Sequence, residues 1–139
     1  MLLSRYFPAR GYAPRLVVAN VGLHMAAHET LAEIRAYFQP RVVRLFQGLR
    51  AAFPNAHVVW VATLDRFGDP ASRPKIEFMN EAARKAARQN DVAFLDAFGL
   101  ADQVRHLAAD GVHLLLEDYL FYRVLRDTIV AWSCAGGAL

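Results

Sequence analysis

Three short apolar runs stand out along the chain, at residues 16–21 (LVVANV), 57–63 (HVVWVAT) and 92–95 (VAFL). None of them alternates cleanly between apolar and polar residues. Such runs are typical of strands that are buried on both faces of a parallel sheet. The pattern therefore predicts three β-strands at these positions.

Apolar residues three and four positions apart predict helices between the strands. The first stripe consists of Leu31, Ile34, Phe38, Val42, Leu45 and Leu49. Because Pro40 interrupts this stripe, we expect a short helix or turn up to about Tyr37. A second helix then begins with Pro40 in its first turn, where a missing N–H costs nothing. Another helix is predicted to follow Ser72 and to run to about Gln89, with Pro74 near its first turn and an alanine-rich body of high helix propensity.

A last amphipathic helix is predicted over about 117–132, packed against the sheet. Its apolar face is Leu116, Leu120, Val124, Thr128 and Trp132, flanked by Phe121, Leu125 and Ile129, and its charged face is Glu117, Arg123, Arg126 and Asp127. Strands that alternate with helices predict βαβ crossovers and a three-layer α/β/α sandwich with a parallel sheet. We divide the chain into an N-terminal stub (1–15), one domain (16–134) and a flexible tail (135–139).

The composition is that of a soluble globular domain, with 139 residues, 55% hydrophobic and 21% charged. No apolar run approaches the roughly 20 residues needed to span a bilayer. The net charge of +3 comes from scattered arginines, so we predict no nucleic-acid partner. Residues 1–15 do not resemble a signal peptide. We therefore expect a cytoplasmic protein if the chain is complete, and the secretory pathway stays open if an N-terminal part is missing.

The only cysteine, Cys134, excludes an intrachain disulfide. We expect it to be a small buried apolar residue near the end of a helix. His28 and Glu29 are adjacent in the sequence, but no third or fourth ligand lies at a suitable spacing. The sequence thus predicts no metal site and no cofactor.

Residues that follow the strands are the best candidates for chemistry, because ligands bind outside the carboxyl ends of parallel strands. Residues 22–24 follow the first strand, 63–65 the second and 96–98 the third. Asp110 and His113 come shortly before the last helix. We interpret Asp96, His57 and His106 as structural.

Asp110 and His113 form an Asp-x-x-His motif in a loop that contains a glycine. A carboxylate three residues away can hold the imidazole in one tautomer, which leaves the other ring nitrogen free to act as a general base. The alternative is an aspartate that caps the next helix and a surface histidine.

Gly22 and His24 follow a buried strand, where a glycine N–H and a histidine side chain can form part of an oxyanion hole. The alternative is a tight strand-to-helix turn with a partly buried His24.

Taken together, the stretches VVANVGLHMA and DGVHLLLEDYLFYRVLRDTIVAWSC resemble the SGNH (GDSL-like) hydrolases. The similarity is greatest to their PC-esterase branch, which includes the neurexophilin-and-PC-esterase-domain proteins, and it covers only the later part of the family domain. The resemblance implies a flavodoxin-like fold and acyl-ester hydrolase or O-acyltransferase chemistry on an acylated glycan or similar ester. It implies His113 as the base, Asp110 as its orienter, and Gly22 with His24 at the oxyanion hole.

The family nucleophile is a serine in a Gly-Asp-Ser block, and this chain has no such block. Its serines are Ser4, Ser72 and Ser133. We therefore expect a truncated domain that lacks the nucleophile and whose first strand lies at a sheet edge. Either the N-terminal stub covers part of this edge, or a second copy or a separate N-terminal half pairs with it. Two alternatives stay open. One is a non-catalytic SGNH-like binding or assembly module, and the other is an α/β protein unrelated to hydrolases.

Overall fold

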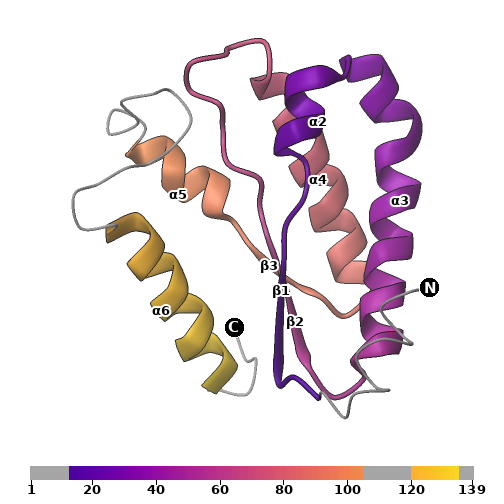
Figure 1. Cartoon of the computed structure of the whole chain (residues 1–139), viewed down its shortest axis with the longest axis vertical. Coiled ribbons are helices and arrows are strands. Elements are labelled where there is room, and N and C mark those ends of the chain that lie inside the picture. The colour runs from indigo at the N-terminus through magenta and orange to yellow at the C-terminus, as the bar shows by residue number, and fades with distance from the viewer. Residues whose placement is uncertain (1–12, 105–119, 135–139) are drawn as a thin grey trace.

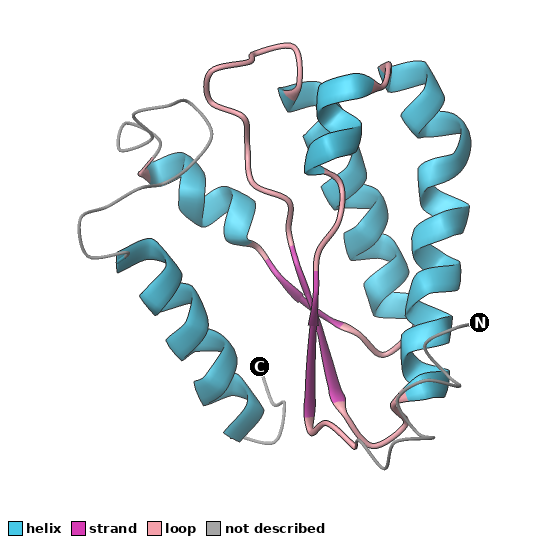
Figure 2. Ribbon diagram, viewed as in Figure 1, coloured by secondary structure: helices cyan, strands magenta, loops and turns pink. Residues whose placement is uncertain are grey.

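The computed structural model describes residues 13–104 and 120–134, and these form an α/β structure around a parallel sheet. The strands are β1 (Leu16–Ala19), β2 (His57–Val61) and β3 (Ala93–Leu95), in the order β1-β2-β3. All three predicted strands are confirmed, although each is shorter than its apolar run. Because β2 pairs parallel with both β1 and β3, the carboxyl ends of the three strands lie together at one edge of the sheet, called the carboxyl edge below (Figure 2).

Helices lie on both faces of this sheet (Figure 1). One face is covered by α2 (Leu23–His28), α3 (Leu31–Ala52) and α4 (Arg73–Gln89). The other face carries α5 (Ala97–Gln103) and α6 (Leu120–Cys134). This layering is compatible with the predicted sandwich.

The central strand β2 is apolar on both sides because it separates two cores. Val58 and Trp60 face the core under α3 and α4, where the Trp60 ring meets Phe46 edge-on at a centroid distance of 5.2 Å. Val59 and Val61 face the smaller core under α5 and α6. This division explains why the β2 run shows no alternation of polar and apolar residues.

Pro40 does not begin a helix, and that prediction was wrong. It lies inside α3, an unbroken helix of 22 residues. Pro40 is exposed, whereas Phe38 and Val42 on either side of it are buried in the core. Burial of the apolar stripe outweighs the hydrogen bond that the proline cannot donate. The buried stripe also differs from the predicted one, because Leu31 and Leu45 are only partly buried and Phe46 is buried instead.

The helix start at Ser72 was predicted correctly, since α4 has Ser72 as its N-cap and a proline in its first turn. Two short helices, α2 and α5, were not predicted. Directly after β3, Asp96 caps α5 and accepts a hydrogen bond from the Gly99 N–H at 3.1 Å. This confirms the structural role expected for Asp96.

The face of α6 that meets the sheet differs from the predicted one. Leu125 and Ile129 pack against the smaller core, whereas Val124 and Thr128 are exposed. Leu116 and the side chains of Leu120, Phe121 and Trp132 lie outside the described part of the chain. Cys134 ends the helix but is exposed, so the expectation that it is buried was wrong.

No helix within 13–104 or 120–134 is both long and apolar enough to cross a membrane.

Candidate functional site

The turns that follow β1 and β2 are joined by side chains at the carboxyl edge. Asn20 donates from Nδ2 to the carbonyl of Val61 at 2.7 Å and to Thr63 Oγ1 at 3.3 Å. Thr63 in turn donates its hydroxyl to the carbonyl of Val21 at 3.0 Å. These bonds fix the chain just before Gly22.

Gly22 occupies a position that only glycine fits. Its φ of 140° lies in the region that side chains avoid, and it is buried. A Cβ there would lie 3.0 Å from Thr63 Oγ1 and 3.3 Å from Met79 Cε. Within the part of the chain that the structure describes, nothing accepts a hydrogen bond from the Gly22 N–H. A buried backbone donor normally has a partner, which makes this N–H a candidate donor for the site.

His24 lies two residues further on, in the first turn of α2, and its side chain is exposed. The alternative of a strand-to-helix turn is right about the turn, since α2 begins at Leu23, but wrong about burial, because His24 is exposed. An exposed imidazole near Gly22 can still donate to a bound ligand.

Asn80 anchors the β2 turn from α4, and the sequence reasoning missed it. Its Oδ1 accepts from the Thr63 N–H at 2.8 Å, and its Nδ2 donates to the Thr63 carbonyl at 2.9 Å. Both residues are buried. The sequence pattern that could have identified Asn80 is its place on the same helix face as Ile76 and Ala83, both of which are fully buried.

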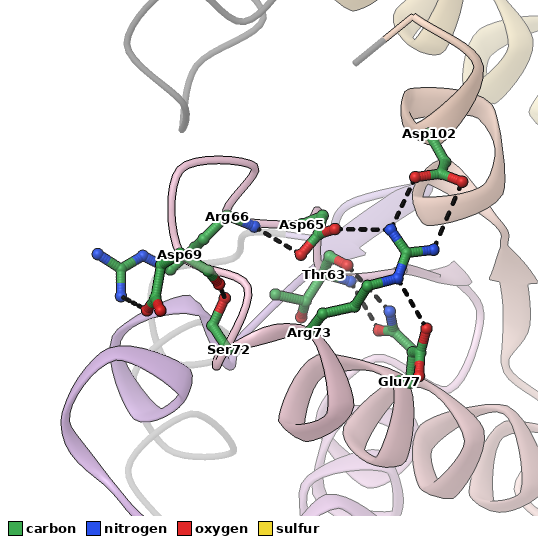
Figure 3. A network of polar contacts seen from close by, with 9 residues as sticks. Thr63, Asp65, Arg66, Asp69, Ser72, Arg73, Glu77 and Asp102 are labelled. Atoms are coloured by element: carbon green, nitrogen blue, oxygen red, sulfur yellow. Dashed lines mark hydrogen bonds and ion pairs between the residues drawn. The ribbon is translucent and has the colours of Figure 1, made fainter. Parts of the chain in front are cut away.

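A charged cluster lies beside this turn and centres on Arg73, the first residue of α4 (Figure 3). Arg73 Nη1 lies 2.8 Å from both Asp65 Oδ2 and Asp102 Oδ1, and its Nε lies 3.0 Å from Glu77 Oε1. Asp65 is only 4% exposed, and its other oxygen accepts from the Arg66 N–H at 2.9 Å. The hydrogen bond to Asp102 is the main reason that the pKa of Arg73 is raised.

This cluster holds elements together more than it offers a binding site. The guanidinium of Arg73 is already bonded through Nε, Nη1 and Nη2, and it lies 5.1 Å from the Phe98 ring centroid. It therefore joins α4 and the β2 turn to α5. A second arginine, Arg84, links the same two helices through Asp96 at 2.8 Å.

The remaining candidates lie outside these contacts. Asp110, His113, His106 and Ser4 are outside the described residues, as is the side chain of Ser133. Ser72 is fully buried and donates its hydroxyl to the Asp69 carbonyl at 2.8 Å. Across 13–104 and 120–134, no group of side chains could hold a metal ion.

No protein-family model matches this chain, and no curated protein is similar enough to count as a relative. The fold brings Gly22, His24, Thr63 and Asp65 to the carboxyl edge of the sheet, as the parallel strand order requires.

Proposed function

We propose that this chain provides the oxyanion-binding and general-base side of an acyl-ester site of the SGNH type, which hydrolyses or transfers an acyl group. The proposal is supported chiefly by the Gly22 N–H, which is buried at the carboxyl edge without a described acceptor. A preorganised backbone donor is what a developing oxyanion needs. The bonds from Asn20 and Thr63 hold the preceding residues in place.

In this mechanism the substrate carbonyl oxygen accepts from Gly22, with His24 as a second donor. His113 removes the proton from an attacking hydroxyl, and Asp110 orients the imidazole. The negative charge that forms on the carbonyl oxygen is then stabilised by the two donors. The substrate is an acylated glycan or a similar ester, and the attacking hydroxyl is unassigned.

A second candidate is a non-catalytic binding or assembly module, and Ser72 favours it. That hydroxyl is buried and already donates to Asp69. It cannot attack an ester without unfolding the start of α4. The catalytic side chains of a hydrolase act as a unit, so a general base without a nucleophile gives little acyl transfer.

Hydrolysis of p-nitrophenyl acetate tests the first candidate. We expect His113→Ala to lower kcat/KM by about 10²-fold or more, the usual effect of losing a general base. His28→Ala is the matched control, because His28 is an exposed histidine on α2 that has no part in the mechanism. Equal rates for wild type and His113→Ala would remove His113 from the mechanism.

A fluorophosphonate probe, which labels activated serines, separates the two candidates. Labelling of one serine that is lost in His113→Ala supports the esterase site and identifies its nucleophile. If no serine is labelled and no ester is hydrolysed, the catalytic proposal fails for this chain and the binding module stands.

A further inference from the structure

The candidate oxyanion donor shares a peptide group with a carbonyl that Thr63 binds. The C=O of Val21 and the N–H of Gly22 belong to one planar trans peptide, in which these two bonds point in opposite directions. Thr63 donates its hydroxyl to this Val21 carbonyl at 3.0 Å. The hydrogen bond therefore fixes the direction of the Gly22 N–H, which points to the side of the peptide opposite the hydroxyl.

Asn20 decides which way the Thr63 hydroxyl donates. The carbonyl of Val61 can only accept, so the amide nitrogen of Asn20 must face it, at a distance of 2.7 Å. The same nitrogen donates to Thr63 Oγ1 at 3.3 Å. Since a hydroxyl carries a single proton, that of Thr63 is left for the Val21 carbonyl.

The position of the Thr63 side chain is itself fixed. Thr63 is 2% exposed, and Asn80 of α4 binds both its N–H and its C=O, at 2.8 Å and 2.9 Å. Its Oγ1 lies only 3.0 Å from where a Cβ of residue 22 would be. Glycine at this position therefore lets the hydroxyl reach the Val21 carbonyl.

The next peptide group is held in a similar way. The Gly22 carbonyl accepts from the Ala26 N–H at 2.9 Å, in the first turn of α2. The carbonyls on both sides of the Gly22 Cα atom thus have donors. Among the described residues, the Gly22 N–H between them has no acceptor.

We propose that Thr63 is a positioning residue, whose hydroxyl locks the Val21–Gly22 peptide with its N–H presented to an oxyanion. The oxyanion rests on the proposed function, whereas the lock does not. The hydrogen bond prevents the peptide plane from turning over, so the donor is preorganised. It also polarises the peptide, which makes the N–H a stronger donor. Thr63 does not touch the substrate and acts through Gly22.

The kinetics of two substitutions test the positioning role. Thr63→Val removes the hydroxyl and keeps the shape of the side chain, whereas Thr63→Ser keeps the hydroxyl. For p-nitrophenyl acetate we expect Thr63→Val to lower kcat about 10- to 100-fold with little change in KM, because the oxyanion forms only in the transition state. Thr63→Ser should retain most of the wild-type kcat.

An HNCO spectrum tests the lock without any need for activity. Its Gly22 cross-peak joins the Gly22 N–H to the carbonyl carbon of Val21, so it reports this one peptide. We expect the cross-peak to move or split in Thr63→Val and to stay near its wild-type position in Thr63→Ser. Thr128→Val is the matched control, because Thr128 also donates to a carbonyl, that of Val124 at 2.8 Å, but on the other face of the sheet (Figure 1). It should leave both the cross-peak and kcat unchanged.

Two substitutions of the exposed Asn20 test the lock with the Thr63 hydroxyl still present. In Asn20→Asp the new carboxylate accepts where the amide donates, so the hydroxyl turns toward it and releases the Val21 carbonyl. We expect the Gly22 cross-peak to move as in Thr63→Val. Asn20→Ala is the control, since it offers no competing acceptor and should leave the lock in place. This pair decides the test if circular dichroism shows that Thr63→Val does not fold.

Each failure points to a different part of the proposal. A Gly22 cross-peak that stays in place in folded Thr63→Val, or that moves equally in Asn20→Asp and Asn20→Ala, would overturn the lock. A cross-peak that moves while kcat is unchanged would overturn the positioning role, as would equal losses of kcat in Thr63→Val and Thr63→Ser. If the wild type hydrolyses no ester, the proposed function fails, and the HNCO spectra alone decide whether the lock exists.

Discussion

At the scale of single residues, Gly22 is the position that should tolerate substitution least. We expect Gly22→Ala to lower the free energy of unfolding by about 1–3 kcal/mol, because a side chain at φ 140° is strained and its Cβ meets Thr63 Oγ1 at 3.0 Å. Urea denaturation measures the effect. Gly99→Ala is the control, since its Cβ would meet Asp96 only at ordinary contact distance. If both variants unfold at the same urea concentration, the tight fit around Gly22 is not real.

Asn80 is the second sensitive residue, because it satisfies both backbone groups of Thr63. Asn80→Ala leaves a buried N–H and a buried carbonyl without a partner, at a cost of about 1–3 kcal/mol. The exposed Asn55 gives a control, for which we expect a change below about 0.5 kcal/mol on substitution by alanine. Chemical denaturation monitored by tryptophan fluorescence measures both variants. An Asn80→Ala protein as stable as wild type would contradict the buried hydrogen bonds to Thr63.

At the scale of elements, Pro40 weakens a helix that packing maintains. Pro40 is exposed inside α3 and cannot donate to the preceding turn. We expect Pro40→Ala to raise the free energy of unfolding by about 1–2 kcal/mol, less than the full helix penalty because proline also restricts the unfolded chain. Thermal unfolding measures it beside Gln39→Ala, the exposed neighbour. A lower melting temperature for Pro40→Ala would show that the proline has a role the helix does not reveal.

The strands and α4 were predictable from the sequence, whereas the short helices and the continuity of α3 through Pro40 were not. Apolar runs located β1, β2 and β3, and Ser72 with its following proline located α4. The six and seven residues of α2 and α5 are too few for a 3.6-residue period to emerge. The face of α6 was misplaced because apolar residues cover a wide arc, and only packing selects Leu125 and Ile129 over Val124.

At the scale of the whole molecule, the rule about carboxyl ends located half of the candidate site. It pointed to Gly22 and to the turn that begins at Thr63, which the structure joins through hydrogen bonds. It could not identify Asn80, Arg73 or Asp102. These side chains reach the edge from helices, so their partners depend on how helix and sheet pack rather than on any spacing along the chain.

The Arg73 cluster connects α4 and the β2 turn to α5, so its loss should lower the stability of the whole domain. Among the described residues, Arg73→Gln leaves the buried Asp65 with only the Arg66 N–H as a partner, and the ion pair between the start of α4 and Asp102 of α5 is lost. We expect a loss of about 2–3 kcal/mol in the free energy of unfolding, limited because Arg73 is partly exposed.

Since the pKa of Arg73 is raised, the contribution of its charge is fully present below the unfolded value and declines only in strong alkali. The loss in Arg73→Gln should therefore be the same at pH 7 and pH 9. The exposed Arg88 is the matched control, and Arg88→Gln should be nearly neutral. Adding Asp65→Asn to Arg73→Gln should recover part of the stability, because the uncompensated carboxylate is then removed. Strictly additive losses in the double variant would mean that the two residues do not act as a pair.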